Sequence, residues 1–401
     1  MEYRLTPVAV VKYLLIGTLL VGQSSCVVAA QILSLLFRPW KNAYSSWHVY
    51  CEELWSQHMV ALKTKTKDGG EAMDEGIELL LRRNSLGKIV GLDLPSRLIL
   101  ISNHQVYADW IYLWCFAYMA NAHGAVKIIL KDALRKLPIF GLVCGMQFFD
   151  FIFLKRKLAA DKVIITQTLE RSRSVDNPMW LVIFPEGTVI SENTRARSKA
   201  FADKLGFVDR TYLLLPRSTG LHLCMATLDD TVEYLYDVTV GYEGVKAGDI
   251  PEEKYTIRGT FFHDIYPKKV HMHLRRWRID SIPVNADAFN QWLLDRWKEK
   301  DALLEEFYRT GKFPLEENKA PLFLPVERVQ HGTEITSTIS STAATRKNTC
   351  VEFPVKLDNI LDLTQVWFLL LPYVPLIGLI MKVFGRSYES GRMGSLARGE
   401  L

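Results

Sequence analysis

One short stretch, LILISNHQVYADW at residues 98–110, constrains the fold more than any other part of the chain. It begins with the apolar run Leu98–Ile101, whose length and composition are typical of a buried strand. Ser102 and Asn103 then turn the chain, and a second apolar run, which opens at Asp109, has the composition of a helix. The stretch therefore predicts a strand, a polar turn and a helix in immediate succession, as in an α/β fold.

His104 and Asp109 in this stretch are candidates for a catalytic pair. In one helix their side chains would lie about 140° apart, at roughly 100° per residue, and would not touch. If His104 lies on the turn and Asp109 opens the helix, the carboxylate can reach back to the imidazole, and the helix N-terminus favours a carboxylate there. The pairing would fix the tautomer and leave the second ring nitrogen as a general base. The alternative is a core histidine whose ring is satisfied by a local carboxylate.

Two further polar loops follow apolar runs in the same way. The segment FPEGT at residues 184–188 follows the apolar run Trp180–Ile183, and LPRSTG at residues 215–220 follows another. In a sheet with parallel strands, loops that leave the carboxyl ends of the strands meet at one edge. We therefore expect a single site, built from these loops and the turn that carries His104.

The residues Asn103, His104, Gln105, Asp109 and Trp110, taken with FPEGT, resemble the glycerolipid acyltransferase family. Downstream segments are similar to one branch of that family, the lysocardiolipin and lysophosphatidylinositol acyltransferases; they lie at residues 191–202, 215–220 and 236–240. The similarity spans about residues 90–285. It implies the α/β fold of that family, a mixed sheet flanked by helices, with apolar membrane-anchoring segments at both ends of the chain.

The resemblance also implies a reaction, acyl transfer from acyl-CoA to a lysophospholipid hydroxyl. An alcohol is a poor nucleophile until it is deprotonated, so His104 would accept the proton as the oxygen attacks the thioester. Asp109 would orient His104 and stabilise the imidazolium. Since the thioester is already activated, the chemistry requires no cofactor, no metal and no serine or cysteine nucleophile, and acyl-CoA is a co-substrate. We expect backbone N–H groups near the helix start to stabilise the oxyanion.

Substrate-binding residues follow from the same resemblance. Lys131 and Arg156 occupy positions that help to bind the acceptor phosphate in the family, although solvated charge at strand ends is the simpler interpretation. Glu186 is expected to bind a glycerol hydroxyl or to orient an arginine. Many members carry Arg directly after the EGT triplet, where this chain has Val189, so other arginines must substitute for it. The candidate set is Asn103, Lys131, Arg156, Glu186, Gly187, Thr188, Arg197 and Arg217.

The acceptor remains open between two classes. The features of the branch and the residue Val189 favour lysophosphatidylinositol or a related remodelling acceptor, and the alternative is 1-acylglycerol-3-phosphate, which would yield phosphatidic acid. A further alternative is a membrane scaffold that retains the fold without catalysis. A lipase or esterase with a nucleophilic serine is excluded, because the chain contains no G-x-S-x-G segment.

Apolar segments predict a membrane protein. Tyr13–Phe37 is uncharged and long enough to span a bilayer, although Gly22–Ser25 interrupts it, so two short helices in one leaflet or a signal peptide are alternatives. Val366–Met381 is apolar but contains two prolines, which favours a kinked span or a re-entrant hairpin. Positive residues beside both segments favour a cytosolic catalytic domain. We expect an integral protein of the endoplasmic reticulum whose partners are the bilayer, acyl-CoA and a lysophospholipid.

Composition sets the remaining limits. The net charge of +5 gives no global basic field for nucleic acid, and six scattered cysteines without a C-x-x-C pair argue against a disulfide scaffold or structural zinc. We predict further strands at 126–130, 148–154, 233–240 and 269–277, and helices at 158–174 and 285–308. The expected units are an N-terminal anchor (1–41), an amphipathic connector (42–90), a catalytic domain (91–325), a flexible Ser/Thr-rich linker (326–358) and a C-terminal membrane segment with a basic tail (359–401).

Overall fold

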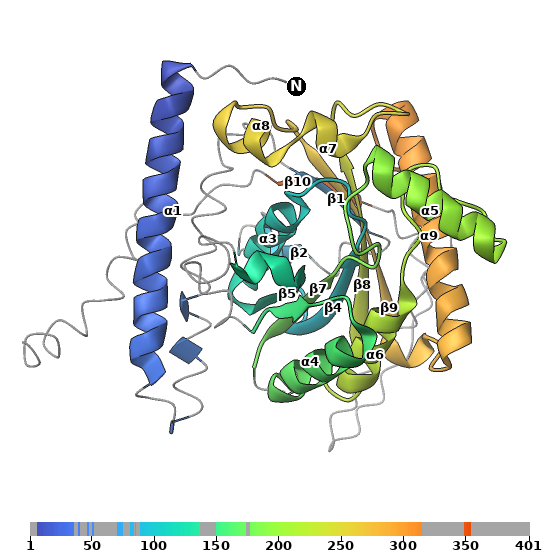
Figure 1. The fold of residues 1–401 in the computed structure, drawn as a ribbon, viewed down its shortest axis with the longest axis horizontal. Helices are drawn as coiled ribbons and strands as arrows, with labels where there is room; N and C mark the ends of the chain where they lie inside the picture. The colour runs from blue at the N-terminus through green and yellow to red at the C-terminus, as the bar shows by residue number, and fades with distance from the viewer. Residues whose placement is uncertain are drawn as a thin grey trace, which may run out of the picture.

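The computed structural model describes most of the expected catalytic domain and an N-terminal helix beside it (Figure 1). The expected C-terminal membrane segment and most of the connector and linker lie outside the described residues. The described residues are 6–35, 39–40, 46–47, 50–51, 70–74, 81–83, 85, 89–136, 150–173, 177–314 and 349–353.

A mixed sheet with the order β10-β1-β9-β8-β4-β7-β5-β6 forms the centre of the fold. The strands β8, β4, β7, β5 and β6 run parallel, and β9 returns antiparallel to β8. The predicted mixed sheet is thus confirmed, and the carboxyl ends of its parallel strands share one edge. The strands are β1 (Gly70–Asp74), β4 (Arg97–Ser102), β5 (Val126–Lys131), β6 (Ile152–Leu154), β7 (Met179–Ile183), β8 (Tyr234–Tyr242), β9 (Val270–Arg278) and β10 (Thr349–Phe353), with β2 (Leu81–Arg83) and β3 (Ile89–Leu92) as a separate pair.

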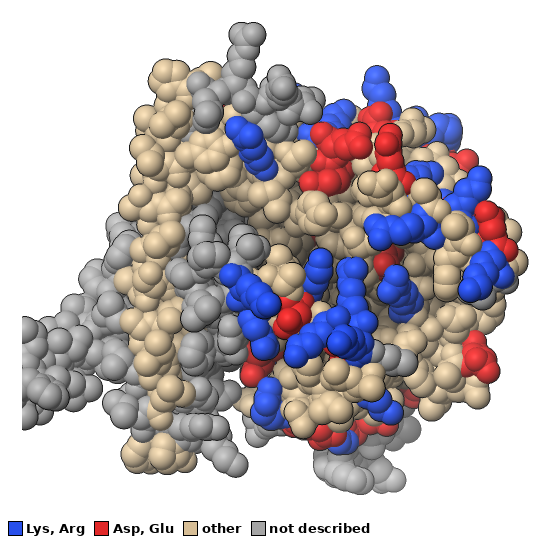
Figure 2. All heavy atoms as spheres, in the orientation of Figure 1, with Lys and Arg blue, Asp and Glu red and all other residues tan. Residues whose placement is uncertain are grey.

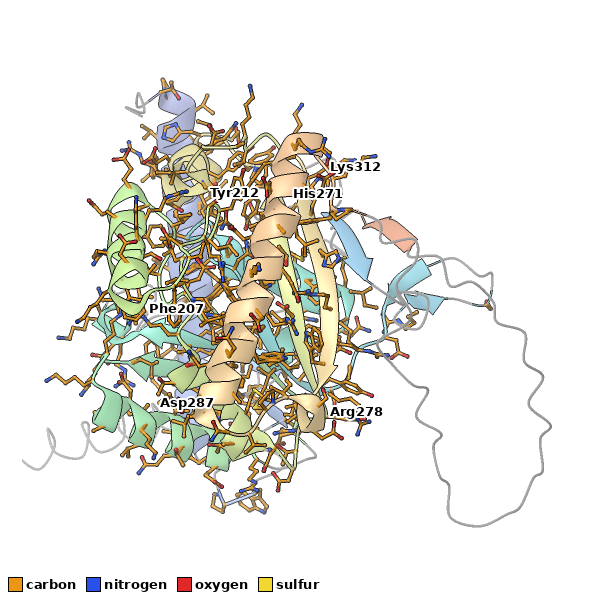
Figure 3. All side chains as sticks on the ribbon, turned by 90° about the vertical axis from the view of Figure 1, so that its right-hand side faces the viewer. Phe207, Tyr212, His271, Arg278, Asp287 and Lys312 are labelled. Carbon is orange, nitrogen blue, oxygen red and sulfur yellow. The ribbon has the colours of Figure 1, made fainter. Side chains whose placement is uncertain are left out.

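Helices cover both faces of the sheet. The helix α3 packs on one face, and α4, α6 and α9 pack on the other. Figure 3 shows α9 lying across the strands, from the end marked by Asp287 to the end marked by Lys312. The helices are α1 (Pro7–Ser34), α3 (Asp109–Met119), α4 (Leu158–Arg171), α5 (Glu192–Leu205), α6 (Ser218–Leu228), α7 (Pro251–Lys254), α8 (Ile257–Phe262) and α9 (Ala286–Thr310), with short 3-10 turns at His123–Ala125, Asp132–Lys136 and Ile279–Ser281.

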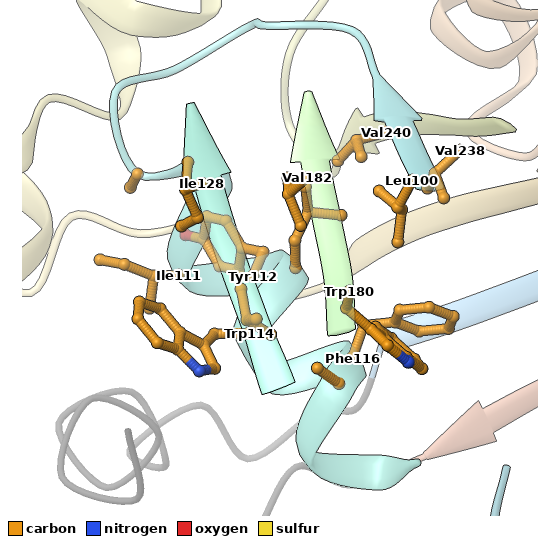
Figure 4. Packing of buried hydrophobic residues seen from close by; sticks show 14 of the residues in the cluster. Leu100, Ile111, Tyr112, Trp114, Phe116, Ile128, Trp180, Val182, Val238 and Val240 are labelled. Carbon is orange, nitrogen blue, oxygen red and sulfur yellow. The ribbon is translucent and has the colours of Figure 1, made fainter. Parts of the chain in front are cut away.

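The face covered by α3 has an aromatic core. Trp114 and Phe116 of α3 are almost wholly buried (Figure 4). The ring of Phe116 lies 5.8 Å from that of Trp180 of β7, and the ring of Trp114 lies 5.9 Å from that of Phe151, measured between centroids. Successive strand residues point to opposite faces, so a strand covered on both sides is apolar throughout. This explains why Leu98–Ile101 in the middle of β4 are all apolar and buried. The helix α3 on this face begins at Asp109.

The opposite face is closed mainly by α9. Its residues Phe289, Leu293, Trp297, Leu304 and Phe307 recur at helical spacing and pack against the alternate strand residues of β4 and β7. The buried stripe predicted for residues 285–308 is therefore confirmed. The helix begins after Asn285, whose side chain accepts from two N–H groups of the first turn, and it ends at Gly311, whose φ of 79° suits glycine.

The helix α1 is continuous, so the sequence Gly22–Ser25 does not divide it into two helices. The Ser25 hydroxyl bonds back to the carbonyl of Val21, which satisfies the polar group within the helix. The stretch Val10–Ile32 is long and apolar enough to cross a membrane. Near the N-terminal end of α1, the ring of Tyr13 stacks at 3.8 Å on Phe262 of α8, which joins this helix to the catalytic domain.

Two strands of the central sheet lie in segments where none was predicted. The strand β1 lies in the expected connector and β10 in the expected linker, and the two pair antiparallel with each other while β1 pairs parallel with β9. Backbone pairing to an existing sheet edge needs no long apolar alternation, so the short sequences GEAMD of β1 and TCVEF of β10 did not indicate these strands. The expectation of a flexible linker is therefore wrong for residues 349–353.

A buried ion cluster joins α9 to the sheet. Lys300 of α9 is fully buried, and its Nζ lies 2.5 Å from an oxygen of the buried Asp237 in β8. Arg275 of β9 binds the other oxygen of Asp237 at 2.8 Å. A buried charge without a partner is costly, so each of these groups depends on the others.

We predict that Lys300→Met destabilises the fold by about 3 kcal/mol, because it leaves the Asp237 carboxylate with Arg275 as its remaining cation. The measurement is the midpoint of denaturant unfolding of the purified protein. Adding Asp237→Asn to Lys300→Met should recover part of the loss, since it removes the uncompensated charge. An unchanged midpoint in the single variant would show that the buried pair contributes nothing to stability.

We also predict that Gly241→Ala destabilises the fold by about 1–3 kcal/mol, as overpacked cores typically do. A Cβ on Gly241 of β8 would lie 2.7 Å from the ring of Phe307, a buried residue of α9. Gly220→Ala in α6 is the control, because a Cβ there meets no atom within 4 Å and alanine favours a helix. Equal thermal midpoints for the two variants would contradict the close contact between β8 and α9.

Candidate active site

His104 and Asp109 meet where the sequence predicts. His104 follows the end of β4, Asp109 is the first residue of α3, and the distance from Nδ1 to Oδ2 is 2.8 Å. The imidazole is 17% exposed and stacks on Phe184 with 4.3 Å between the ring centroids, whereas the carboxylate is fully buried. Phe184 therefore covers one face of the imidazole, and Asp109 holds the edge that carries Nδ1.

The Asp109 carboxylate accepts four hydrogen bonds. Oδ2 receives the N–H groups of Gln105 at 2.7 Å and Val106 at 3.1 Å in addition to the imidazole. Oδ1 receives the hydroxyl of Tyr242, the last residue of β8. Because the carboxylate is a hydrogen-bond acceptor, the Nδ1 that faces it carries the proton, and the free lone pair of the imidazole is on Nε2. Sequence reasoning missed Tyr242, because it is distant in the chain from Asp109 and belongs to no local motif.

Glu186 joins three loops of the site. Oε1 accepts the N–H of His104 at 3.1 Å and the indole N–H of Trp297 at 3.4 Å, and Oε2 accepts the N–H of Leu214 at 3.2 Å. Burial raises the pKa of Glu186 to about 8, against the opposing effect of these donors. Both oxygens are thus engaged by the protein itself, so the side chain fixes the loops that follow β4 and β7 and the loop before α6.

The turn after β4 is held at nearly every residue. Asn103 is fully buried, and its amide donates to the carbonyl of Val240 at 2.9 Å and accepts from the N–H of Val240 at 2.8 Å. The Gln105 amide accepts from the hydroxyl of Tyr308 in α9 at 3.0 Å. Asn103, expected to bind substrate, therefore uses both polar ends of its side chain to bind β8.

The backbone of the same turn is bound by carboxylates. The N–H of Tyr107 donates to Glu252 of α7 at 2.6 Å, and burial raises the pKa of Glu252 to about 7. Together with the bonds to Glu186 and Asp109, this engages the N–H groups of residues 104–107. These four groups are therefore not available to an oxyanion, although they lie at the helix start where such donors were expected.

The expected phosphate ligands lie around the FPEGT loop. Arg156 donates from Nη2 to the carbonyl of Gly187 at 2.8 Å, and the N–H of Arg217 donates to the carbonyl of Pro185 at 2.8 Å. Lys131 ends β5 opposite Leu154 of β6, two residues before Arg156. These three basic side chains thus belong to one edge of the sheet, and Figure 2 shows Lys and Arg side chains gathered across the middle of this face.

The other expected substrate residues differ in position. Gly187 is exposed and has a φ of 71°, a conformation that favours glycine, and the neighbouring Thr188 is half-buried. Val189, at the position where many family members have arginine, is buried with 2% exposure. Arg197 lies on the exposed surface of α5, where its Nε contacts the carbonyl of Asn193 at 3.3 Å, so the structure does not bring it into the FPEGT loop.

The two histidines of β9 pack against aromatic rings. His271 lies 4.9 Å from Phe307 and His273 lies 5.8 Å from Phe313, measured between ring centroids. Among the residues that the structure describes, no group of three or more His, Cys, Asp or Glu side chains is arranged to hold a metal ion.

Comparisons with known proteins place these residues in a family. The acyltransferase model matches residues 88–243, and the acyltransferase C-terminus model matches residues 248–343. An uncharacterised acyltransferase of Schizosaccharomyces pombe is 40% identical over 219 residues, which cover 55% of this chain and 62% of that protein. The 2-acyl-1-lysophosphatidylinositol acyltransferase of Saccharomyces cerevisiae is 38% identical over 254 residues, covering 55% and 64%. Lysocardiolipin acyltransferase 1 of Danio rerio is 36% identical over 218 residues, covering 54% and 53%.

The matches span less than two thirds of the length of these relatives. They nevertheless coincide with the part of the chain that builds the site. The first matched region contains His104, Asp109 and Glu186, and the second contains Glu252 and the whole of α9. The chain belongs to the acyltransferase family.

Proposed function

We propose that this chain transfers an acyl group from acyl-CoA to a free hydroxyl of a lysophospholipid. The observation that carries the proposal is the contact between His104 Nδ1 and the buried Asp109 carboxylate. It leaves Nε2 as a base at the edge of the sheet where Lys131, Arg156 and Arg217 also lie.

The proposed mechanism is general base catalysis. His104 Nε2 takes the proton of the acceptor hydroxyl while its oxygen attacks the thioester carbonyl, and Asp109 stabilises the resulting imidazolium. Collapse of the tetrahedral intermediate breaks the C–S bond, and the imidazolium returns its proton to the CoA thiolate. The balanced products are the ester and free CoA, with the enzyme regenerated.

The acceptor phosphate is assigned to Arg156, Arg217 and Lys131. The guanidinium group can donate two parallel hydrogen bonds to a phosphate, which makes the two arginines the stronger ligands. Buried Val189 contributes none, so the role that arginine has after the EGT triplet elsewhere in the family passes to these side chains. We rank Arg197 below them, because it lies on α5 outside the FPEGT loop.

Lysophosphatidylinositol or a related remodelling acceptor is the proposed acceptor. The names of the yeast and zebrafish relatives, which specify lysophosphatidylinositol and lysocardiolipin, support this choice. Lysophosphatidic acid is the alternative, with phosphatidic acid as the product. The apolar helix α1 supports a membrane location, and we place the chain in the endoplasmic reticulum membrane with the catalytic domain on the cytosolic side.

We predict that His104→Ala lowers transfer at least about a hundredfold, the contribution typical of a general base. Asp109→Asn should lose less, but still several-fold. The measurement uses membranes that contain each variant, labelled acyl-CoA and a panel of lysophosphatidylinositol, lysocardiolipin and lysophosphatidic acid. His222→Ala is the matched control, because His222 lies on α6 and bonds to the carbonyl of Val284.

The panel separates the alternatives. Labelled lipid from wild type and His222→Ala, but not from His104→Ala, supports the proposed chemistry, and the preferred acceptor distinguishes remodelling from phosphatidic acid synthesis. Substantial transfer by His104→Ala would remove His104 as the base. Wild-type protein that labels none of the acceptors above the His104→Ala background would favour the scaffold.

We predict that Arg217→Ala and Arg156→Ala each raise the KM for the acceptor roughly tenfold, the effect of losing one charge-assisted hydrogen bond. The KM for acyl-CoA should change less. Arg173→Ala is the control, since Arg173 pairs with Asp230 on the surface. An acceptor KM that stays at the wild-type value in either variant would assign the phosphate to another side chain.

A further inference from the structure

The mechanism proposed above accounts for one oxygen of the Asp109 carboxylate. Oδ2 accepts from His104 and from two backbone N–H groups. Oδ1 points to β8 and accepts from the hydroxyl of Tyr242. Both side chains are fully buried, so this contact is shielded from solvent.

We propose that Tyr242 is a positioning residue for the reaction, whose hydroxyl fixes the orientation of the Asp109 carboxylate beside His104. The inference rests on the proposed function, in which His104 is the general base. Neither the motif around His104 nor the FPEGT loop contains Tyr242, and it acts through Asp109 without touching the reacting atoms.

The geometry explains why a donor on Oδ1 matters. A carboxylate can rotate about its Cβ–Cγ bond, and a donor on each oxygen from a different element removes that freedom. Here α3 carries Asp109, the turn after β4 supplies the donors to Oδ2, and β8 supplies the donor to Oδ1. A hydrogen bond to an ionised group shifts an equilibrium by roughly tenfold or more, which is enough to decide between an aligned and a misaligned carboxylate.

The surroundings of Tyr242 keep its hydroxyl a donor. Burial, together with the charge of Asp109, holds the pKa of Tyr242 well above its ordinary value, so the phenol retains its proton. Its ring lies 5.3 Å from the ring of Tyr112 and 6.3 Å from the ring of Tyr255. This aromatic cluster fixes the phenol and leaves its hydroxyl directed at Asp109.

Other ionisable groups face the pair from each neighbouring element. They are Glu186 after β7, Glu252 of α7, Tyr112 of α3 and Tyr308 of α9. Tyr242→Phe changes none of them and keeps the ring. Removing its hydroxyl destabilises the ionised carboxylate, which raises the proton affinity of the His104–Asp109 pair as a unit. The acid limb of the pH profile, where the base becomes protonated, should therefore move to higher pH.

The experiment compares Tyr242→Phe with Tyr255→Phe in the full-length protein. Tyr255 is a matched control, because its hydroxyl donates to the carbonyl of Glu243 and its ring belongs to the same aromatic cluster. We expect Tyr242→Phe to lower kcat roughly tenfold or more, to leave KM for both substrates within about twofold of wild type, and to move the acid limb upward. Tyr255→Phe should keep the wild-type kcat and limb.

A second measurement does not depend on activity. Diethyl pyrocarbonate modifies the neutral imidazole, so the rate at which His104 is modified, followed by peptide mass spectrometry across pH, reports the ionisation of His104. We expect its midpoint to move to higher pH in Tyr242→Phe and to stay unchanged in Tyr255→Phe, with thermal midpoints that show both variants folded. The modification experiment tests the inference even if the wild type transfers no acyl group. A wild type without transfer would overturn only the proposed function.

The inference is overturned by either of two results. One is a Tyr242→Phe variant whose modification midpoint and acid limb match those of the wild type. The other is an equal loss of kcat in both variants without any shift, which would show that the tyrosine hydroxyls serve packing alone.

Discussion

The buried carboxylate of Asp109 is the constraint on which the arrangement of the site depends. An ionised carboxylate without solvent must be surrounded by donors, and here the donors come from the imidazole, two backbone N–H groups and the Tyr242 hydroxyl. These donors can converge only if the turn after β4 folds back over the first residue of α3 while the end of β8 lies alongside. The pairing of β4 with β8 is therefore a requirement of the site as well as of the sheet.

The same turn is also held from outside. Glu186 binds its backbone from the loop after β7, Tyr308 binds it from α9, and Glu252 binds it from α7. The region that matches the acyltransferase model thus contains His104, and the region that matches the C-terminus model contains part of its support. The basic residues Lys131 at the end of β5, Arg156 after β6 and Arg217 before α6 lie at the same edge of the sheet.

Features of the fold and site that depend on residues close together in the chain could be predicted from the sequence, whereas contacts between distant segments could not. The contact between His104 and Asp109 follows from a local spacing, and the buried stripe of α9 follows from helical periodicity, so both were predicted. The partners of Glu186 and the donor Tyr242 depend on how α9 and β8 pack against distant loops, which no local pattern encodes.

The strands β1 and β10 were missed because backbone pairing at a sheet edge leaves little trace in side-chain chemistry. The roles assigned to Asn103 and Glu186 assumed open side chains, whereas both are buried and bound to backbone.

The central claim is that His104 Nε2 is the base that deprotonates the acceptor. The most direct test is an experimental structure with a lysophospholipid and an unreactive thioether analogue of acyl-CoA. The account predicts the acceptor hydroxyl within about 2.6–3.2 Å of Nε2, the reach of a general base, with its phosphate beside Arg156 and Arg217. A hydroxyl bound elsewhere, with Nε2 of His104 facing protein atoms, would contradict it.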